Sequence, residues 1–444
     1  MMATSGGALP KASVPDTLAI LGEVLVPTLA KGTLFRRPKA VAVAERLQLD
    51  ERAVRRLQKL NGKYGDGPLL LRIPFRRQAV ILAPGHVHSV LAHSPEPFAT
   101  ASSEKRAALS HFEPRNVLIS HGADRELRRR LHEQALDSGN PVHRSADAFL
   151  RMAREEADEL LQRAEAAGML EWNAFAEAWY RMARRVVFGD SARDDYELTD
   201  MLAALRANAN WAFLKPKNLA LRTEFLARVE DRMRSSDEGS LAWFMARAAT
   251  APEAAPADQI AQWLFGFDGP ALGAFRTLAL LATHPGQAEA ARREAQAQPE
   301  GRHLPYLRAC VLEALRLWPT TPMILRQTTR RVDLDGSVLP AKCGVLIYVA
   351  YFSRDQRHLP AADRFDPDLW LDQDSRTDWP LVPFSEGPAE CPARELVLMF
   401  SSAFLARLLT RADFRLVSHQ QLTPAKPLPG TLNSFALRFA VAAR

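Results

Sequence analysis

The chain has 444 residues, of which 47% are hydrophobic and 25% charged, values close to those of ordinary globular proteins. This composition excludes an intrinsically disordered protein, a collagen-like repeat and a small disulfide-stapled domain. Arginine and lysine total 58 against 51 acidic residues, a net charge of +7, and only ten of the 58 are lysine. An arginine excess suits either nucleic-acid binding or the capture of buried carboxylates. The longest purely basic run is residues 128–130, and both alternatives stay open.

The cysteines and histidines show no ligand pattern of their own. Cys310, Cys343 and Cys391 are widely spaced, so neither a disulfide framework nor a zinc ribbon is implied, and the eleven histidines include no metal-ligand helix motif. The most apolar N-terminal stretch, residues 18–30, falls short of the roughly 20 residues that span a bilayer. We therefore expect a soluble cytoplasmic protein without a membrane anchor.

The N-terminal part is predicted to pass from a tail to helices and then to a hairpin. Residues 1–14 are expected to be a flexible tail, because the first ten are rich in glycine, alanine and serine. Residues 15–444 are expected to form a single domain, since no long linker interrupts them. Apolar residues at three- and four-residue spacing predict helices over residues 15–60. Two short apolar runs, at residues 69–74 and 79–82, predict a β-hairpin.

The remainder is predicted to be a helical body followed by short strands. From about residue 85 to residue 315 alanine, leucine, arginine and glutamate dominate, which is typical of helices. Breaks are expected at residues 137–140, 188–190 and 250–252. Strand signals return at residues 330–336, 345–349, 414–417 and 437–440. The fold class is therefore predicted to be mainly α (α+β), a long helical body with a few small β-sheets.

Cys391 is the first candidate for chemistry. It follows a loop made rigid by prolines and a glycine, and Pro392 is suited to begin a helix that continues through residue 400. Backbone N–H groups and the positive end of the helix dipole favour the thiolate, which is the form that binds iron. The alternative interpretation is a buried, inert cysteine in front of a helix.

A charged pair on an apolar helix is the second candidate. Glu313 and Arg316 lie three residues apart on a helix expected from about residue 305 to residue 317, so their side chains share a face. Because the neighbouring residues are leucine and tryptophan, we expect a buried ion pair. The alternative is an ordinary pair on the helix surface.

The third candidate is a proline-punctuated coil at residues 358–370 that contains Arg364. The order of motifs is Glu-x-x-Arg, Asp-Arg-Phe, Phe-x-x-Gly, and a cysteine four residues after that glycine. This order closely resembles the cytochrome P450 superfamily of haem-thiolate monooxygenases, over about residues 65–440. The chain resembles soluble bacterial-type members, atypical in the distal helix and the haem loop. The resemblance implies one cytochrome P450-type domain with haem b (iron protoporphyrin IX) as cofactor.

The resemblance also assigns residues to the haem. Cys391 would be the iron ligand, and Phe384 and Gly387 would shape the loop beside it. A salt-bridge triad behind the haem would consist of Glu313, Arg316 and Arg364. The haem propionates would be contacted by Arg125 and Arg129, four residues apart on one helix, and by Arg326. A solvated basic helix face remains the alternative for the first two arginines. The chain departs from the family at Ala389, where an arginine or histidine usually contacts a propionate.

The distal helix shows the largest departure. Residues 263–271 align with the family's helix over the haem, in which an acid and a threonine aid oxygen binding and proton delivery. Asp268 keeps the acid, whereas Gly269 replaces the hydroxyl residue and Pro270 is expected to kink the helix. Asp268 and Gly269 are thus the positions implied in catalysis. Protons could come through Asp268 and ordered water, from a group on the substrate, or from hydrogen peroxide used as oxidant.

The substrate pocket implied by the resemblance is mostly apolar, which favours a hydrophobic small molecule. Its residues would be Phe265, Phe267, Ala271, Thr320, Thr321 and Met323, with Ser434 near the last turn. Since Phe265 and Phe267 are two apart on a helix, at most one of them faces the iron, and core packing is the alternative for both.

The leading functional hypothesis is a monooxygenase that inserts oxygen from O2 into an apolar molecule. Electrons would come from a ferredoxin- or flavodoxin-type donor, attracted by the cationic residues Arg128, Arg130 and Arg394. We expect a monomer that binds no nucleic acid. The enzymatic alternatives are a peroxide-driven peroxygenase and a haem-catalysed rearrangement, although Gly269 offers no arginine for a fatty-acid carboxylate. The non-enzymatic alternatives are a haem- or ligand-binding module and an arginine-rich nucleic-acid binder.

Overall fold

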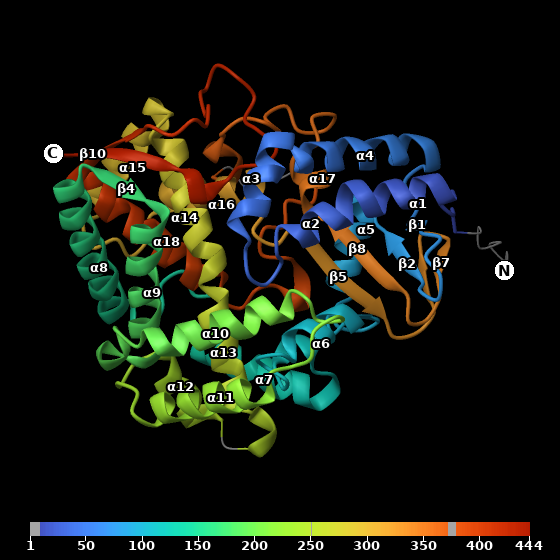
Figure 1. Cartoon of the computed structure of the whole chain (residues 1–444), viewed down its shortest axis with the longest axis horizontal. Coiled ribbons are helices and arrows are strands. Elements are labelled where there is room, and N and C mark those ends of the chain that lie inside the picture. Colours follow the sequence, from blue (N-terminus) through green and yellow to red (C-terminus); the bar gives the residue numbers. More distant parts are fainter. Residues whose placement is uncertain (1–8, 250, 372–378) are drawn as a thin grey trace.

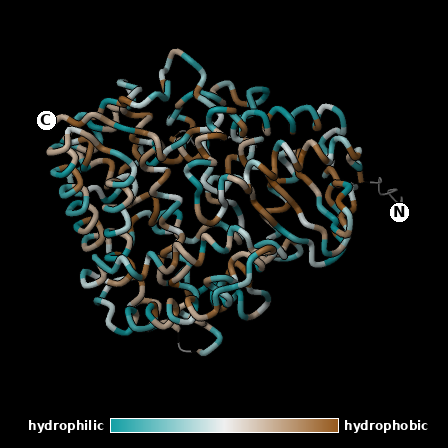
Figure 2. Tube along the Cα trace, in the orientation of Figure 1, coloured by the Kyte–Doolittle hydropathy of each residue, from teal (hydrophilic) through white to brown (hydrophobic). Residues whose placement is uncertain are grey.

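The computed structural model describes residues 9–249, 251–371 and 379–444. A helical body occupies one side of the molecule and a sheet-rich region the other (Figure 1). The strands of the sheet-rich region are mostly hydrophobic, whereas α4 along its outer edge is largely hydrophilic (Figure 2). Two hydrophobic clusters correspond to this division, one in the helical body and one between the sheet and the N-terminal helices.

Eighteen α-helices are present in the described residues. They are α1 Val14–Ile20, α2 Val26–Ala30, α3 Pro38–Leu47, α4 Leu49–Tyr64, α5 Pro84–Ala92, α6 Ser103–Leu109, α7 Gly122–Ala135, α8 Ala146–Ala167, α9 Trp172–Phe188, α10 Tyr196–Ala209, α11 Leu219–Arg234, α12 Leu241–Ala248, α13 Pro256–Gly266, α14 Asp268–Leu281, α15 Pro285–Ala297, α16 Pro305–Leu317, α17 Val349–Ser353 and α18 Arg394–Arg411. A π-helical segment, η1 Leu21–Leu25, joins α1 to α2. Several helices begin at proline, whose fixed φ and missing N–H suit the first helical turn. None of the helices in the described residues has the length and apolar character needed to cross a membrane.

The strands form three sheets. They are β1 Leu69–Leu70, β2 Gln78–Val80, β3 Phe98–Ala99, β4 Met169–Glu171, β5 Met323–Thr328, β6 Val332–Leu334, β7 Ser337–Leu339, β8 Gly344–Tyr348, β9 Ala412–Leu416 and β10 Arg438–Ala443. The largest sheet has the order β1-β2-β8-β5-β3, with β2 and β8 parallel and the other pairs antiparallel. The others have the orders β4-β10-β9 and β6-β7. The mainly α fold with small sheets is thus confirmed.

The hairpin prediction is confirmed, with Leu69 opposite Val80. Strand β5 was not expected, because its six residues follow a Pro-Thr-Thr-Pro turn and alternate only weakly in polarity. The prediction of a tail over residues 1–14 is wrong for its last part. The Ala12 amide donates to the Leu70 carbonyl at 2.9 Å, and the Ala12 side chain is buried. Residues 1–8 lie outside the described residues.

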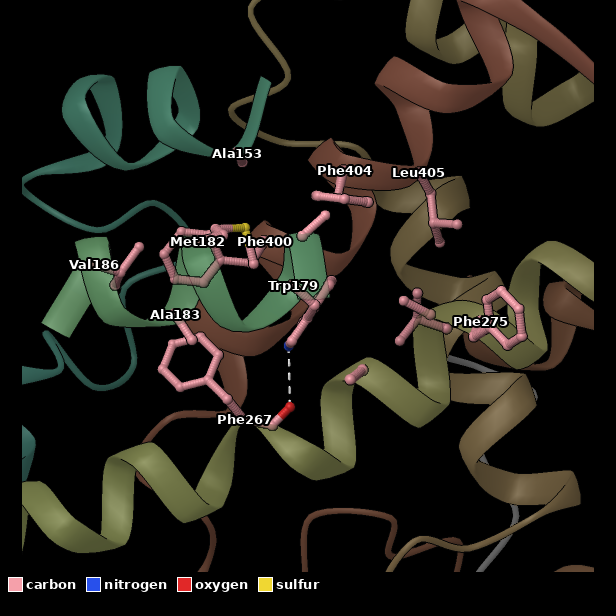
Figure 3. Packing of buried hydrophobic residues seen from close by; sticks show 14 of the residues in the cluster. Ala153, Trp179, Met182, Ala183, Val186, Phe267, Phe275, Phe400, Phe404 and Leu405 are labelled. Atoms are coloured by element: carbon pink, nitrogen blue, oxygen red, sulfur yellow. Dashed lines mark hydrogen bonds between the residues drawn. The ribbon is translucent and has the colours of Figure 1, made fainter. Parts of the chain in front are cut away.

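The expected kink in the distal helix is a complete break between α13 and α14. Proline at 270 has no N–H to donate to the carbonyl of Gly266, four residues earlier, and its ring crowds that carbonyl. Phe267 therefore ends one helix and caps the next. Its carbonyl accepts hydrogen bonds from the Ala271 amide at 3.2 Å and from the Trp179 indole of α9 at 3.0 Å (Figure 3). The break is thereby fixed to the centre of the helical body.

Candidate functional site

The loop before α18 holds Cys391 in a closed turn. The Cys391 amide donates to the Phe384 carbonyl at 2.9 Å. Gly387 has a φ of 69°, which favours glycine. A Cβ added at Gly387 would also lie 2.7 Å from the Leu91 carbonyl oxygen of α5, too close for any side chain. Phe384 and Gly387 therefore shape this loop through their backbones, and Gly387 lets α5 pack directly against it.

The helix after Cys391 starts later than the sequence predicts. Pro392 lies in a turn, and α18 begins at Arg394. Burial raises the pKa of the Cys391 thiol, although the Ala393 amide and the charge of Arg129 act in the opposite direction. Burial thus acts against the thiolate in the chain without a bound metal, whereas the Ala393 amide and Arg129 act for it. The Cys391 side chain keeps some accessible surface.

Two cations close to this loop act differently from the prediction. Arg129 donates to Glu133 at 2.5 Å and to the Glu390 carbonyl at 2.6 Å, so its guanidinium holds the cysteine loop in place of an external anion. Arg128 is buried, with its side chain bonded to Ser120 and the Glu253 carbonyl, and it offers no surface to a protein partner. Burial of the Arg128 aliphatic stem against neighbouring helices explains the difference.

Three other cations lie near one another and form no ion pair with a carboxylate of the described residues. Arg125 is buried, its Nε has no hydrogen-bond partner, and its guanidinium makes no ion pair with any described residue. Arg326 of β5 donates only to neutral groups, Ser94 at 2.8 Å, Ser385 at 3.2 Å and a backbone carbonyl. Burial and the charge of Arg125 lower the pKa of Arg326 to about 10.

Lys105 of α6 is the third member of this group, which we call the cation cluster: Lys105, Arg125 and Arg326. Burial and repulsion from Arg326 and Arg125 lower the pKa of Lys105 to about 7. Arg125 and Arg326 are buried, and Lys105 is partly exposed. Cations held close together without a counter-ion are costly, so these three would suit an anion between them. Sequence reasoning missed Lys105, since nothing in its Ser-Ser-Glu-Lys-Arg context separates it from an ordinary helix-start residue.

A prosthetic group with two carboxylates and one metal fits these residues. Cys391 provides a single sulfur ligand, and the cation cluster provides the compensating charges. No group of three histidine, cysteine or acidic side chains in the described parts of the chain could hold a metal ion by itself. The donor set therefore suits a metal whose other ligands come from the prosthetic group, as in haem.

The Glu313–Arg316 pair is buried as expected. Arg316 donates to both Glu313 oxygens, at 2.7 and 2.6 Å, and neither residue is more than 2% exposed. The remaining Arg316 donors reach the carbonyls of Ser353, Ala361, Ala362 and Arg364. Glu313 also accepts from the Asp366 amide at 3.0 Å and the Trp370 indole at 2.9 Å.

The expected third member of the triad takes part only through its backbone. The Arg364 carbonyl accepts from Arg316 at 3.0 Å, whereas the Arg364 side chain is exposed and forms no ion pair among the described residues. The Trp370 indole and the Asp366 amide occupy the Glu313 oxygens instead. The sequence motif located the coil correctly, but it assigned the contact to the Arg364 guanidinium where the structure uses the Arg364 carbonyl.

The acid of the distal helix is held by partners that the sequence did not reveal. Asp268 accepts hydrogen bonds from Tyr180 of α9 and Arg206 of α10. Burial, together with the Asp268 charge, raises the pKa of Tyr180 well above its usual value, so this phenol stays protonated. A Cβ on Gly269 would lie 3.3 Å from the Thr320 hydroxyl, so that hydroxyl stands beside the position where the family carries its own.

The predicted pocket residues divide into three groups. Phe267 and Ala271 belong to the buried core, where Phe267 packs on Phe400 with ring centroids 6.1 Å apart, so neither lines a pocket. Thr321 is exposed, and Thr320 and Met323 are half-buried. Phe265 is half-buried between the Phe112 ring and the Arg206 guanidinium. The break at Phe267 explains the outcome, because it turns the two phenylalanines in different directions.

The chain shares its C-terminal part with many proteins of one family. The family model described as Cytochrome P450 matches residues 266–437. A protein named probable cytochrome P450 4ac3, from Drosophila melanogaster, is 30% identical over 177 residues, covering 37% of this chain and 34% of the relative. A β-amyrin 24-hydroxylase from Glycine max is 29% identical over 180 residues, covering 36% and 35%. The match thus spans about a third of the length of these curated relatives.

The fold match covers nearly the whole chain. A cyanobacterial structure described as retinoic acid bound CYP120A1 superposes with a TM-score of 0.71 over 87% of this chain and 94% of that one, at 19% identity. The likeness to this family thus rests on residues 266–437 and, over the rest of the chain, on the fold. Residue 389 is alanine, and Lys105 brings a cation into the same cluster as Arg125 and Arg326.

Breaking the buried pair should destabilise the fold strongly. Replacing Glu313 with Gln leaves the Arg316 charge uncompensated in the core, so we expect a loss of about 3–5 kcal/mol in the free energy of unfolding. Urea unfolding followed by circular dichroism measures this loss. The matched control is Arg364→Gln, which should cost less than about 0.5 kcal/mol because that side chain is exposed. An equal loss in both variants would mean that the Arg364 guanidinium does support the pair.

The Lys105 pKa makes the stability of the haem-free protein depend on pH. Because folding lowers the pKa of Lys105 from 10.5 to about 7, the folded chain binds fewer protons than the unfolded chain between these values. Stability attributable to Lys105 therefore rises with pH across this window. The Lys105→Met variant should be more stable than the wild type at pH 7, by a margin that shrinks towards pH 10.

Thermal unfolding of the haem-free proteins at several pH values tests this expectation. The control Lys39→Met removes an exposed lysine and should show no such trend. Adding haem should reverse the order of the Lys105→Met variant and the wild type, since an anion in the cluster turns the Lys105 charge into a stabilising one. A constant difference between wild type and Lys105→Met at all pH values would show that Lys105 is not desolvated.

Proposed function

We propose that the chain is a haem-thiolate monooxygenase that inserts one oxygen atom of O2 into an apolar small molecule. The observation that supports this most strongly is the combination of a free Cys391 with a cation cluster that forms no ion pair among the described residues and that contacts the cysteine loop through Arg326 and Ser385. When bound, haem b would supply the activation of dioxygen. Electrons would come from a separate ferredoxin- or flavodoxin-type protein. One related protein is named a β-amyrin 24-hydroxylase and another structure is described as retinoic acid bound, which supports a largely apolar substrate.

The chain's own residues would hold the cofactor from two directions. Cys391 would bind the iron as thiolate, and the positive charge of the metal would offset the desolvation that raises the thiol pKa. Arg125, Arg326 and Lys105 would pair with the two propionates. Arg129 holds the cysteine loop through the Glu390 carbonyl, so it would position the sulfur.

Proton delivery would depend on the neighbourhood of the helix break. Gly269 has no hydroxyl, and Asp268 is already bonded to Arg206 and Tyr180. The Thr320 hydroxyl lies beside Gly269 and can donate or accept a proton there. The proposal therefore includes a role for Thr320 as the hydroxyl that residue 269 lacks. Asp268 would deliver no proton while it is paired with Arg206.

The identity of the iron ligand can be tested by spectroscopy. The reduced protein under carbon monoxide should absorb near the wavelength that gives the family its name, and Cys391→Ser should abolish that band because an alcohol is a poor ligand in place of thiolate. The matched control is Cys343→Ser. This variant changes a buried cysteine directly before β8 and should keep the band. A band typical of histidine-ligated haem, or failure to retain haem, would contradict the proposal.

The oxidant and the role of Thr320 can be tested by comparing two sources of oxygen. With reductant, partner and O2, Thr320→Val should lower the product formed per electron by about tenfold or more, with release of peroxide, because a proton donor is lost. With hydrogen peroxide supplied directly, wild type and Thr320→Val should give equal rates. Unchanged coupling in Thr320→Val would assign proton delivery to Asp268 or the substrate. Turnover with peroxide alone would favour the peroxygenase alternative.

A further inference from the structure

A second group of cations lies in a small recess beside α14. The recess has a volume of about 50 Å3 and is bounded by α14, the turn after α16, β8 and the segment before β10. Lys31, Arg36 and Arg276 face it, together with one carboxylate, Asp50. Its apolar wall includes Leu272, next to the distal helix break. Three cations against one carboxylate leave two positive charges uncompensated in this recess.

Of the three cations, Arg276 most clearly lacks partners for its hydrogen-bond donors. It is 8% exposed, on an otherwise apolar stretch of α14. Its Nε donates to the Ser434 hydroxyl at 2.9 Å and its Nη1 to the Trp318 carbonyl at 2.5 Å, whereas its Nη2 has no hydrogen-bond partner among the described residues. Burial and the nearby charge of Arg36 lower the pKa of Arg276 to about 9.

The other charged groups do not neutralise Arg276. Arg36 donates to the carbonyls of Gly32 at 3.0 Å and Thr320 at 2.6 Å and forms no ion pair with a described residue. Asp50 is bonded to Lys31, to the Tyr348 phenol at 3.1 Å and to the Thr431 hydroxyl at 3.0 Å. The Asp50 charge is therefore already committed to Lys31.

The recess shares a wall with the distal side of the site. The backbone of Thr320 accepts the Arg36 hydrogen bond, while its hydroxyl faces Gly269 of α14. Beyond this wall Asp268 contributes an attractive charge to Arg36, but its oxygens are bonded to Arg206 and Tyr180. Thr320 therefore links Arg36 of the recess to the segment around Gly269.

We propose that Arg36 and Arg276 bind an anionic group of the substrate, which is therefore an apolar molecule carrying a carboxylate or a similar oxyanion. The inference rests on the proposed monooxygenase function and adds the polarity of the substrate's far end. Planar guanidinium groups suit such an oxyanion, because each can donate two parallel hydrogen bonds. Leu272 and the apolar residues of the recess would cover the part of the substrate next to that group.

Binding of matched ligands tests the proposal. Isothermal titration calorimetry with decanoate and with methyl decanoate compares one chain length with and without a charge. The wild-type holoprotein should bind decanoate at least about tenfold more tightly, the minimum expected from a charge-assisted hydrogen bond in a buried site. Arg276→Gln should remove most of this preference while leaving the affinity for the ester unchanged, and Arg276→Lys should restore part of it.

A second variant and a control keep the test independent of folding. Arg36→Gln changes a less enclosed residue and should reduce the same preference by a similar factor. The control Lys39→Gln removes an exposed nearby cation that does not face the recess, and it should change nothing. Equal affinity of the wild type for acid and ester would overturn the proposal. Equal weakening of both ligands in Arg36→Gln and Arg276→Gln would overturn it as well.

Two further measurements separate the possible failures. Titration with sodium sulfate alone reports a site for a free anion. Sulfate binding that is lost in Arg276→Gln, without any preference for decanoate over its ester, would overturn the substrate role. The carbon monoxide spectrum of the same preparation reports the haem-thiolate centre. A normal spectrum without acid preference refutes only this inference, whereas acid preference without a haem spectrum refutes only the proposed function.

Discussion

The ion pair between Glu313 and Arg316 is the constraint on which the arrangement of the site depends. It is buried in the last turns of α16, and its hydrogen bonds reach α17, the coil at residues 361–366 and Trp370. A buried charge is tolerated only where each donor and acceptor is satisfied, so the coil has one position that completes the set. Helix α16 packs against both α18 and the segment that contains Trp370, so the ion pair ties this region to the helix that follows the cysteine loop.

Many arginines of this chain form ion pairs with carboxylates inside the molecule. Asp195 binds Arg228 and Arg232, and the buried Glu156 binds Arg185 and Arg193. Such groups balance charge locally, which explains how an arginine-rich chain can bury so many of its cations. The imbalance is concentrated at two places, the cation cluster near Cys391 and the recess beside α14. Both imbalances occur next to internal space, where an anionic group can complete the charge balance.

The interruption at Phe267 shapes the distal side of the site. Pro270 cannot donate to the Gly266 carbonyl, and the Trp179 indole donates to the Phe267 carbonyl (Figure 3). Asp268 accepts hydrogen bonds from Arg206 and Tyr180, and Gly269 lies against Thr320. The hydroxyl that Gly269 lacks thus has a neighbour in Thr320, which lies about fifty residues later in the sequence, in the turn before β5.

The sequence by itself determined the fold class, the hairpin, the helix break at Pro270 and the burial of Glu313 with Arg316, because each depends on local periodicity, proline geometry or residues one helical turn apart. Arg276, a single charge in the apolar stretch of α14, was a visible signal that reasoning from motifs did not use. The roles of Lys105, Arg206 and Thr320, and the exposure of Arg364, were decided only by the tertiary structure. Whether a charge is balanced depends on which distant groups surround it, and that is a property of packing, which spacing along one chain does not contain.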